Sequence, residues 1–76
     1  MSAESSPPEE LLLEVARWEQ AVWSPDATTG TIDLRNEATR AALSAGWTVD
    51  DVAGRVGVKP ADVARWAGAS HHLLTE

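Results

Sequence analysis

Apolar residues recur at helical spacing along most of this chain, and no alternating run is long enough to predict a strand. Over residues 9–23 they form a stripe at positions i, i+4, i+7 and i+11: Leu11, Val15, Trp18 and Val22. Such a stripe is one face of an amphipathic helix. Pro25 ends this helix, because the residue before a proline is disfavoured in the helical region. We therefore expect a first helix over residues 9–23 and a loop over residues 24–32.

A second helix is predicted over residues 33–45. Asp33 is a natural N-cap, since its carboxylate can accept a hydrogen bond from a free backbone N–H group of the first turn. The apolar positions that follow it are Leu34, Ala38, Ala41, Ala42 and Ala45. Gly46 then stands where glycine commonly ends a helix.

The next segment predicts two short helices joined by a tight turn, over residues 48–56 and 60–67. Thr48 is a good N-cap, and Asp51 stands three residues later, in an acidic variant of the capping box. The first of these helices then has one apolar face, formed by Val49, Val52, Ala53 and Val56.

Glycine and proline mark the turn between these two helices. Gly57 stands where a left-handed residue closes a helix, a conformation that costs glycine little. Pro60 stands at the first position of the next helix, where no backbone N–H group is needed. The inward face of that helix is expected to hold Val63, Trp66 and Ala67.

Six residues of this segment follow a known pattern: Val52, Ala53, Gly57, Val58, Val63 and Trp66. In these residues the chain resembles the helix-turn-helix superfamily of bacterial regulators, the type found in small repressors, resolvase tails and sigma-factor promoter-reading domains. The resemblance implies an all-α fold, a small four-helix domain that contains a tri-helical helix-turn-helix. The few residues after Gly68 leave no room for a β-wing. The function implied is that of a small DNA-binding transcriptional regulator.

In this superfamily the second helix of the motif presents its first turn and its outward face to the major groove of DNA. The resemblance therefore implies DNA contacts from Thr48, Arg55, Lys59, Ala61, Ala64 and Arg65. Arg65 can pair with guanine, and Lys59 can reach guanine or phosphate. The two alanines can touch only a thymine methyl group.

The charge of the chain bears on how strongly it would bind DNA. Its formal net charge is -6 at pH 7, and the charges are unevenly spread. Residues 1–30 hold one arginine against six carboxylates, whereas residues 31–68 hold five cations against five carboxylates. With about three phosphate contacts, the logarithm of the binding constant falls with the logarithm of salt concentration at a slope of about -3. A single copy would bind weakly, so we expect the regulator to act as a dimer.

The first predicted helix carries more apolar surface than one small core can cover, because three successive leucines occupy three different faces. We expect an interface with a second copy or a protein partner, formed by Leu12, Leu13, Ala16 and Trp23. The alternative function is a protein–protein interaction module, or a transcription-machinery adaptor, whose acidic first helix binds a partner. A third hypothesis is an acidic mimic that occupies a partner's DNA site.

Four tryptophans, with no Phe or Tyr, are the largest side chains available to the core. We expect Trp18 and Trp66 to be buried and Trp47 to cover the junction between helices. Trp23 lies off the main stripe of its helix. Its ring could either shield the core or form part of a partner-binding patch.

No enzymatic activity is expected of this chain. It has no cysteine, phosphate-binding loop, nucleophile elbow or metal-ligand spacing. His71 and His72 are adjacent and so do not share a helix face, which argues against a metal site. We therefore expect no cofactor and no small-molecule substrate.

Residues 9–68 are expected to form a single domain, between a disordered tail over residues 1–8 and a C-terminal tail over residues 69–76. No apolar run approaches the roughly 18 residues needed to span a membrane, and no signal peptide is recognisable. A bacterial cytoplasmic protein that binds no membrane is the expectation.

Overall fold

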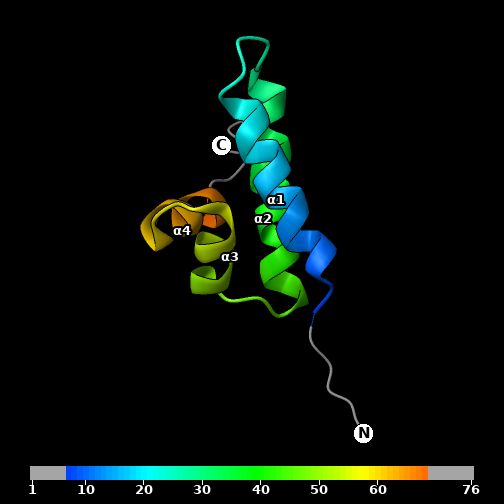
Figure 1. The fold of residues 1–76 in the computed structure, drawn as a ribbon, viewed down its shortest axis with the longest axis vertical. Coiled ribbons are helices and arrows are strands. Elements are labelled where there is room, and N and C mark those ends of the chain that lie inside the picture. The colour runs from blue at the N-terminus through cyan, green and yellow to red at the C-terminus, as the bar shows by residue number, and fades with distance from the viewer. Residues whose placement is uncertain (1–6, 69–76) are drawn as a thin grey trace, which may run out of the picture.

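The computed structural model describes residues 7–68, which form four helices and no strand. The helices are α1 (Glu9–Val22), α2 (Thr29–Ala45), α3 (Val49–Val56) and α4 (Pro60–Gly68). α1 and α2 run antiparallel as a long hairpin, and α3 and α4 pack against one side of it (Figure 1). The loop end of the hairpin extends beyond α3 and α4 (Figure 1). The predicted small all-α architecture of four helices is confirmed.

The start of α2 differs from the prediction, because Thr28 and not Asp33 caps this helix. The Thr28 hydroxyl accepts the backbone N–H of Thr31 at 3.3 Å, and the Thr31 hydroxyl accepts the backbone N–H of Thr28 at 3.2 Å. This reciprocal capping box closes the first turn even though Gly30, a poor helix former, lies within it. The helix therefore begins four residues before its predicted start, and its first turn takes the last four residues of the predicted loop over residues 24–32.

The short helices of the second half begin and end within one residue of the predicted bounds. Thr48 and Asp51 form a capping box at the start of α3, with hydrogen bonds of 3.0 and 3.1 Å. Gly57 closes α3 in the left-handed region at φ 86°, and its N–H donates to the carbonyl of Ala53 at 2.8 Å. We refer to α3, α4 and the connecting residues 57–59 as the α3–α4 unit. Local signals fix both ends of α3.

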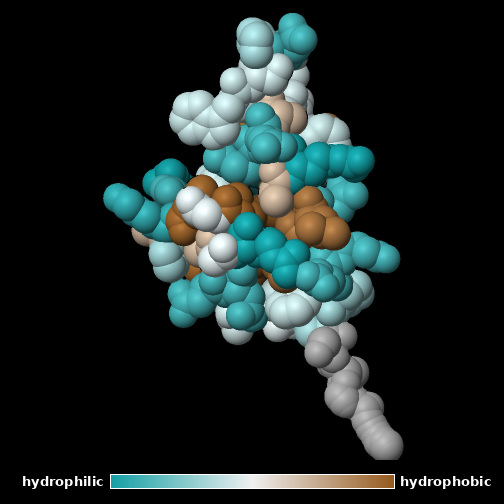
Figure 2. All heavy atoms as spheres, in the orientation of Figure 1, coloured by the Kyte–Doolittle hydropathy of each residue, from teal (hydrophilic) through white to brown (hydrophobic). Residues whose placement is uncertain are grey.

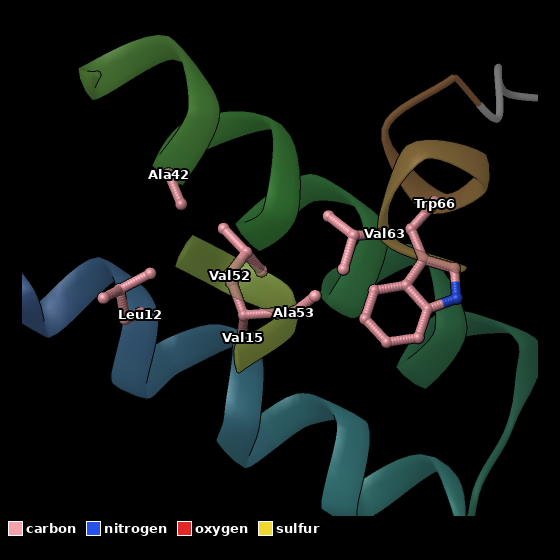
Figure 3. Close-up of a cluster of buried hydrophobic side chains, with 7 residues drawn as sticks. All are labelled: Leu12, Val15, Ala42, Val52, Ala53, Val63 and Trp66. Atoms are coloured by element: carbon pink, nitrogen blue, oxygen red, sulfur yellow. The ribbon is translucent and has the colours of Figure 1, made fainter. Parts of the chain in front are cut away.

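One hydrophobic core joins the hairpin to the α3–α4 unit. The buried side chains come from all four helices: Leu12, Val15, Ala42, Val52, Ala53, Val63 and Trp66. Figure 3 shows them converging between the hairpin and the α3–α4 unit. Three valines in this cluster are fully buried, and burial of each stabilises the fold by roughly 1.5–3 kcal/mol relative to an exposed side chain.

A polar cluster beside this core links three helices through Arg35. Its guanidinium forms an ion pair with Glu19 of α1 at 3.0 Å and donates two hydrogen bonds, of 3.2 and 3.1 Å, to the side-chain oxygen of Asn36. It also lies 4.2 Å from the ring centroid of Trp66 on α4. Both charged side chains are only 13% exposed. Loss of one partner would leave the other largely buried without a counter-charge, which makes this pair structural.

The four tryptophans occupy four different environments. Trp66 is buried, as predicted. Trp18 is only half-buried, so its predicted place in the core is wrong. Trp47 is half-buried between α2 and α3, where its indole N–H donates to the carbonyl of Pro8 at 2.9 Å. Trp23, at the end of α1, is 79% exposed.

The Trp47 hydrogen bond also corrects the predicted N-terminal tail. Pro7 and Pro8 were expected to belong to the tail over residues 1–8, yet they lie against the junction between α2 and α3. The remaining parts of the predicted tails, residues 1–6 and 69–76 with His71 and His72, lie outside the described residues. Within residues 7–68 no helix combines the length and the apolar character that crossing a membrane requires.

Candidate nucleic-acid interface

The connection between α3 and α4 sets the direction of α4. The N–H of Val58 donates to the same Ala53 carbonyl as the N–H of Gly57, at 3.1 Å, and the Val58 side chain packs against the core. The carbonyl of Lys59 then accepts the first hydrogen bonds of α4, from the N–H groups of Asp62 and Val63. Only three residues separate the two helices, so the backbone at the start of α4 is held tightly against the end of α3.

α4 has one buried face and one exposed face. Val63 and Trp66 point into the core. Ala61, Ala64 and Arg65 stand at i, i+3 and i+4 and are all exposed, so they share the outward face. Lys59, which is also exposed, precedes the first turn of the helix. Four of the predicted DNA-contact residues therefore lie on or next to the exposed surface of α4: Lys59, Ala61, Ala64 and Arg65.

Two of the three cations predicted to contact DNA already have carboxylate partners. Arg65 forms an ion pair at 2.8 Å with Asp62, one turn earlier on α4. Arg55, in the last turn of α3, forms an ion pair with Glu9 at the start of α1. Lys59 forms no salt bridge with any residue between 7 and 68. Exposed pairs of this kind stabilise a protein by about 0–1 kcal/mol, so a phosphate group can replace the carboxylate at small cost.

Thr48, the last predicted DNA contact, has a structural task. Its hydroxyl oxygen accepts the backbone N–H of Asp51 at 3.0 Å and thereby caps α3. The residue is exposed, and its hydroxyl hydrogen remains available to donate to an acceptor. Contact with DNA would add to the cap and not compete with it.

The predicted partner interface on α1 is only partly exposed. Leu12 is 3% exposed in the core, so its assignment to an interface is wrong. The choice among three successive leucines depends on the side from which α2 and α3 pack, which the sequence pattern of α1 does not specify. Leu13, Ala16 and Trp23 remain accessible, and Leu13 is 53% exposed.

These three residues line one concavity together with residues of the α3–α4 unit. We call it the α1–α3 hollow, and its apolar lining is Leu13, Ala16, Trp23, Val56 and Val58. Figure 2 shows hydrophobic side chains gathered on this face, over α1 and the α3–α4 unit. The rim carries both signs of charge, with Arg17 and Arg55 on one hand and Glu19 on the other. The predicted interface residues therefore meet at a surface that includes the turn after α3.

Two features of the structure were missed by the sequence reasoning. The ion pair of Arg35 with Glu19 joins residues sixteen positions apart on different helices, and neither residue carries a local signal for it. A second apolar groove, between α1 and α2, is lined in part by Trp18, which was expected to be buried. Both features depend on how α1 packs against α2.

No metal site is evident in the described part of the chain, where no group of three or more His, Asp or Glu side chains could hold an ion. Comparisons with protein-family models, with curated proteins and with solved structures give no match for this chain. The functional proposal therefore depends on the residues and geometry described above.

Proposed function

We propose that the protein is a small helix-turn-helix transcriptional regulator that places α4 in the major groove of DNA. The exposed outward face of α4 is the observation that carries the proposal. Ala61 and Ala64 have short side chains, so the helix can lie close to the base edges, and Arg65 extends from the same face. The major groove is wide enough to admit an α-helix.

Each residue at this surface has a chemical role in the proposal. Arg65 leaves Asp62 and donates to guanine or to a phosphate oxygen, while the two alanines contact thymine methyl groups. Lys59 and Arg55 bind phosphates and position the helix without reading sequence. To make this contact, Arg55 leaves Glu9 and pairs with a phosphate instead.

The charge of the chain limits how tightly one copy binds. About three phosphate contacts give a salt slope near -3, and the carboxylates around α4 oppose the approach of DNA. We therefore propose that two copies act together on adjacent half-sites, as helix-turn-helix proteins commonly do.

The chain offers a matched pair of arginines with which to test this proposal. Arg65 pairs with Asp62 three residues earlier at 70% side-chain exposure, and Arg17 pairs with Glu14 three residues earlier at 69%. Alanine substitution changes the net charge equally in the two cases. Only Arg65 lies on the exposed face of α4.

The measurement is the fluorescence anisotropy of labelled random-sequence duplex DNA at a salt concentration of about 50 mM. Arg65→Ala and Lys59→Ala are each expected to weaken binding about tenfold, because each removes one contact to DNA. Arg17→Ala should bind like the unmodified protein. Absence of binding by the unmodified protein, or an equal loss in Arg17→Ala, would overturn the proposal.

A second candidate function is favoured by the α1–α3 hollow. The exposed Trp23 and Leu13 beside Val56 and Val58 give this concavity apolar side chains of the kind that bind protein, within a polar rim. Its apolar side chains suit a second copy of the chain, since a two-fold contact would bury the exposed Trp23 and Leu13 of both copies. Occupation by a different protein would make the chain an interaction module or adaptor. Sedimentation velocity of the unmodified protein and of Trp23→Ser separates these cases, since only self-association gives a dimer that the substitution dissociates.

A further inference from the structure

A groove runs between α1 and α2, at a surface that α3 and α4 do not cover. Its lining residues come from the two hairpin helices alone: Leu11, Glu14, Trp18, Leu34, Glu37, Ala38 and Ala41. We call it the α1–α2 groove. It is separate from the exposed face of α4 and from the α1–α3 hollow.

The floor of the α1–α2 groove is apolar and straight. Leu34, Ala38 and Ala41 stand at i, i+4 and i+7 on α2, so they form one stripe along the helix. Leu11 and Trp18 stand seven residues apart on α1 and face this stripe. Seven residues of helix rise about 10 Å, so the floor matches two turns of a bound helix. The short alanines make room for larger side chains from outside.

The floor keeps apolar surface in contact with water. Leu34 is 42% exposed, and Trp18 is half-buried. The Trp18 indole N–H donates to the carboxylate of Glu14 at 3.2 Å, which holds the ring at the edge of the groove. The groove is therefore a formed surface with its aromatic side chain already oriented.

The walls of the groove are acidic. Glu14, which forms an ion pair with Arg17 at 3.5 Å, lines the α1 side, and Glu37 lines the α2 side. Glu37 is exposed and forms no salt bridge within residues 7–68. One turn before these residues stand Glu10 on α1 and Asp33 on α2, which extend the acidic character of each wall. The groove thus combines an apolar floor with negative charge on both sides.

We propose that the α1–α2 groove binds a basic amphipathic helix of a partner protein. Apolar residues at i, i+4 and i+7 of that helix would fill the space above Ala38 and Ala41, and flanking lysines or arginines would pair with Glu14 and Glu37. A partner helix with one apolar stripe bordered by cations is complementary to this groove, whose apolar floor is bordered by carboxylates.

The charge of the walls disfavours the other occupants of such a groove. A second copy would bring the same carboxylates to the interface, because a two-fold contact pairs identical surfaces. Nucleic acid and anionic lipid surfaces are negatively charged and are repelled for the same reason. The proposal does not depend on DNA binding by α4.

The probe for this proposal is a fluorescein-labelled helical peptide with leucines at i, i+4 and i+7 and lysines beside them. A comparison peptide keeps the leucines and carries glutamate in place of lysine. The groove variant is Leu34→Lys, and the matched control is Leu13→Lys, an equally charged substitution at an exposed leucine on another face of the hairpin. Circular dichroism of both variants checks that each is folded.

Saturable binding of the lysine peptide to the full chain is expected, with little binding of the glutamate peptide. Leu34→Lys should weaken it about tenfold or more, and Leu13→Lys should change it by no more than about twofold. Glu37→Gln should weaken it by about threefold at low salt, with Asp26→Asn as the control for loss of one charge elsewhere.

Several results would overturn the proposal. These are no saturable binding of the lysine peptide, equal binding of the glutamate peptide, or equal loss in Leu34→Lys and Leu13→Lys. A dimer of the unmodified protein that Leu34→Lys dissociates would also overturn it, since a second copy would then occupy the groove. DNA binding by Leu34→Lys, measured separately, reports on α4 and keeps the two proposals distinguishable.

Discussion

The hairpin and the α3–α4 unit share one core but have different outer surfaces. The large apolar side chains that stay exposed all lie on the hairpin or at its loop end, among residues 7–68: Leu13, Trp23, Ile32 and Leu34. The outward face of α4 carries no large apolar side chain, and its longest side chain is that of Arg65. This difference underlies our two proposals, in which the α1–α2 groove of the hairpin binds a basic helix and α4 binds DNA.

The two regions also differ in what holds them together. The α3–α4 unit depends on local features, namely the capping box at Thr48 and the left-handed Gly57. The hairpin depends on contacts between residues far apart in sequence, such as the pair of Arg35 with Glu19 and the hydrogen bond from Trp47 to Pro8. The substitutions below test the contact between the two regions, the local features of the α3–α4 unit and the local cap of α2.

The largest effect is expected where α4 joins the hairpin. Trp66→Ala removes a buried ring that lies against Arg35, and we expect it to lower the free energy of unfolding by about 3–5 kcal/mol. Trp23→Ala, at a ring that is 79% exposed, should change it by less than about 0.5 kcal/mol. Urea denaturation followed by circular dichroism compares them. Similar losses in both variants would mean that the α3–α4 unit is not anchored through Trp66.

Alanine substitutions at two glycines of the α3–α4 unit are expected to have intermediate effects on stability, with opposite signs at the two positions. Gly57→Ala forces a side chain into the left-handed region at φ 86°, which should cost about 1–2 kcal/mol. Gly54 lies within α3, and a methyl group there meets no atom within 4 Å. Gly54→Ala should therefore stabilise the protein by about 0.5–1 kcal/mol through its higher helix propensity. Thermal unfolding measures both, and destabilisation by Gly54→Ala would show that α3 is not packed as described.

A smaller loss than that of Gly57→Ala is expected at the start of α2. Thr28→Ala removes the N-cap hydroxyl and should lower the free energy of unfolding by about 1 kcal/mol. Asp33→Ala, within the helix, should have almost no effect. Chemical denaturation of the two variants decides between the caps. A larger loss of unfolding free energy in Asp33→Ala would mean that Asp33 caps the helix, as the sequence pattern predicts.

Local chemistry explains which parts of the fold the sequence predicted. The α3–α4 unit was predicted closely, because its caps, its turn glycine and the first proline of α4 act on neighbouring residues. The start of α2 was not, because Thr28 and Asp33 are both good caps and the length of the hairpin loop decides between them. The exposed face of α4 follows from the helical period once Val63 and Trp66 are buried.

The surfaces of the hairpin were harder to predict for a different reason. Three successive leucines begin α1, and only the packing of α2 and α3 decides that Leu12 is buried while Leu13 is exposed. The same packing leaves Trp18 at the edge of the α1–α2 groove. The ion pairs of the cations could not be predicted either, since Arg55 pairs with Glu9, 46 positions away in the sequence. A single sequence contains no local signal for any of these contacts.

The salt dependence of duplex binding tests the central claim, that α4 is a DNA-binding surface, most directly. For the unmodified protein the plot of log K against log salt concentration should have a slope near -3. Lys59→Ala should reduce the magnitude of that slope by about one, whereas Arg17→Ala should leave it unchanged. A slope of zero, absence of binding at low salt, or the same change of slope in both variants would contradict the account.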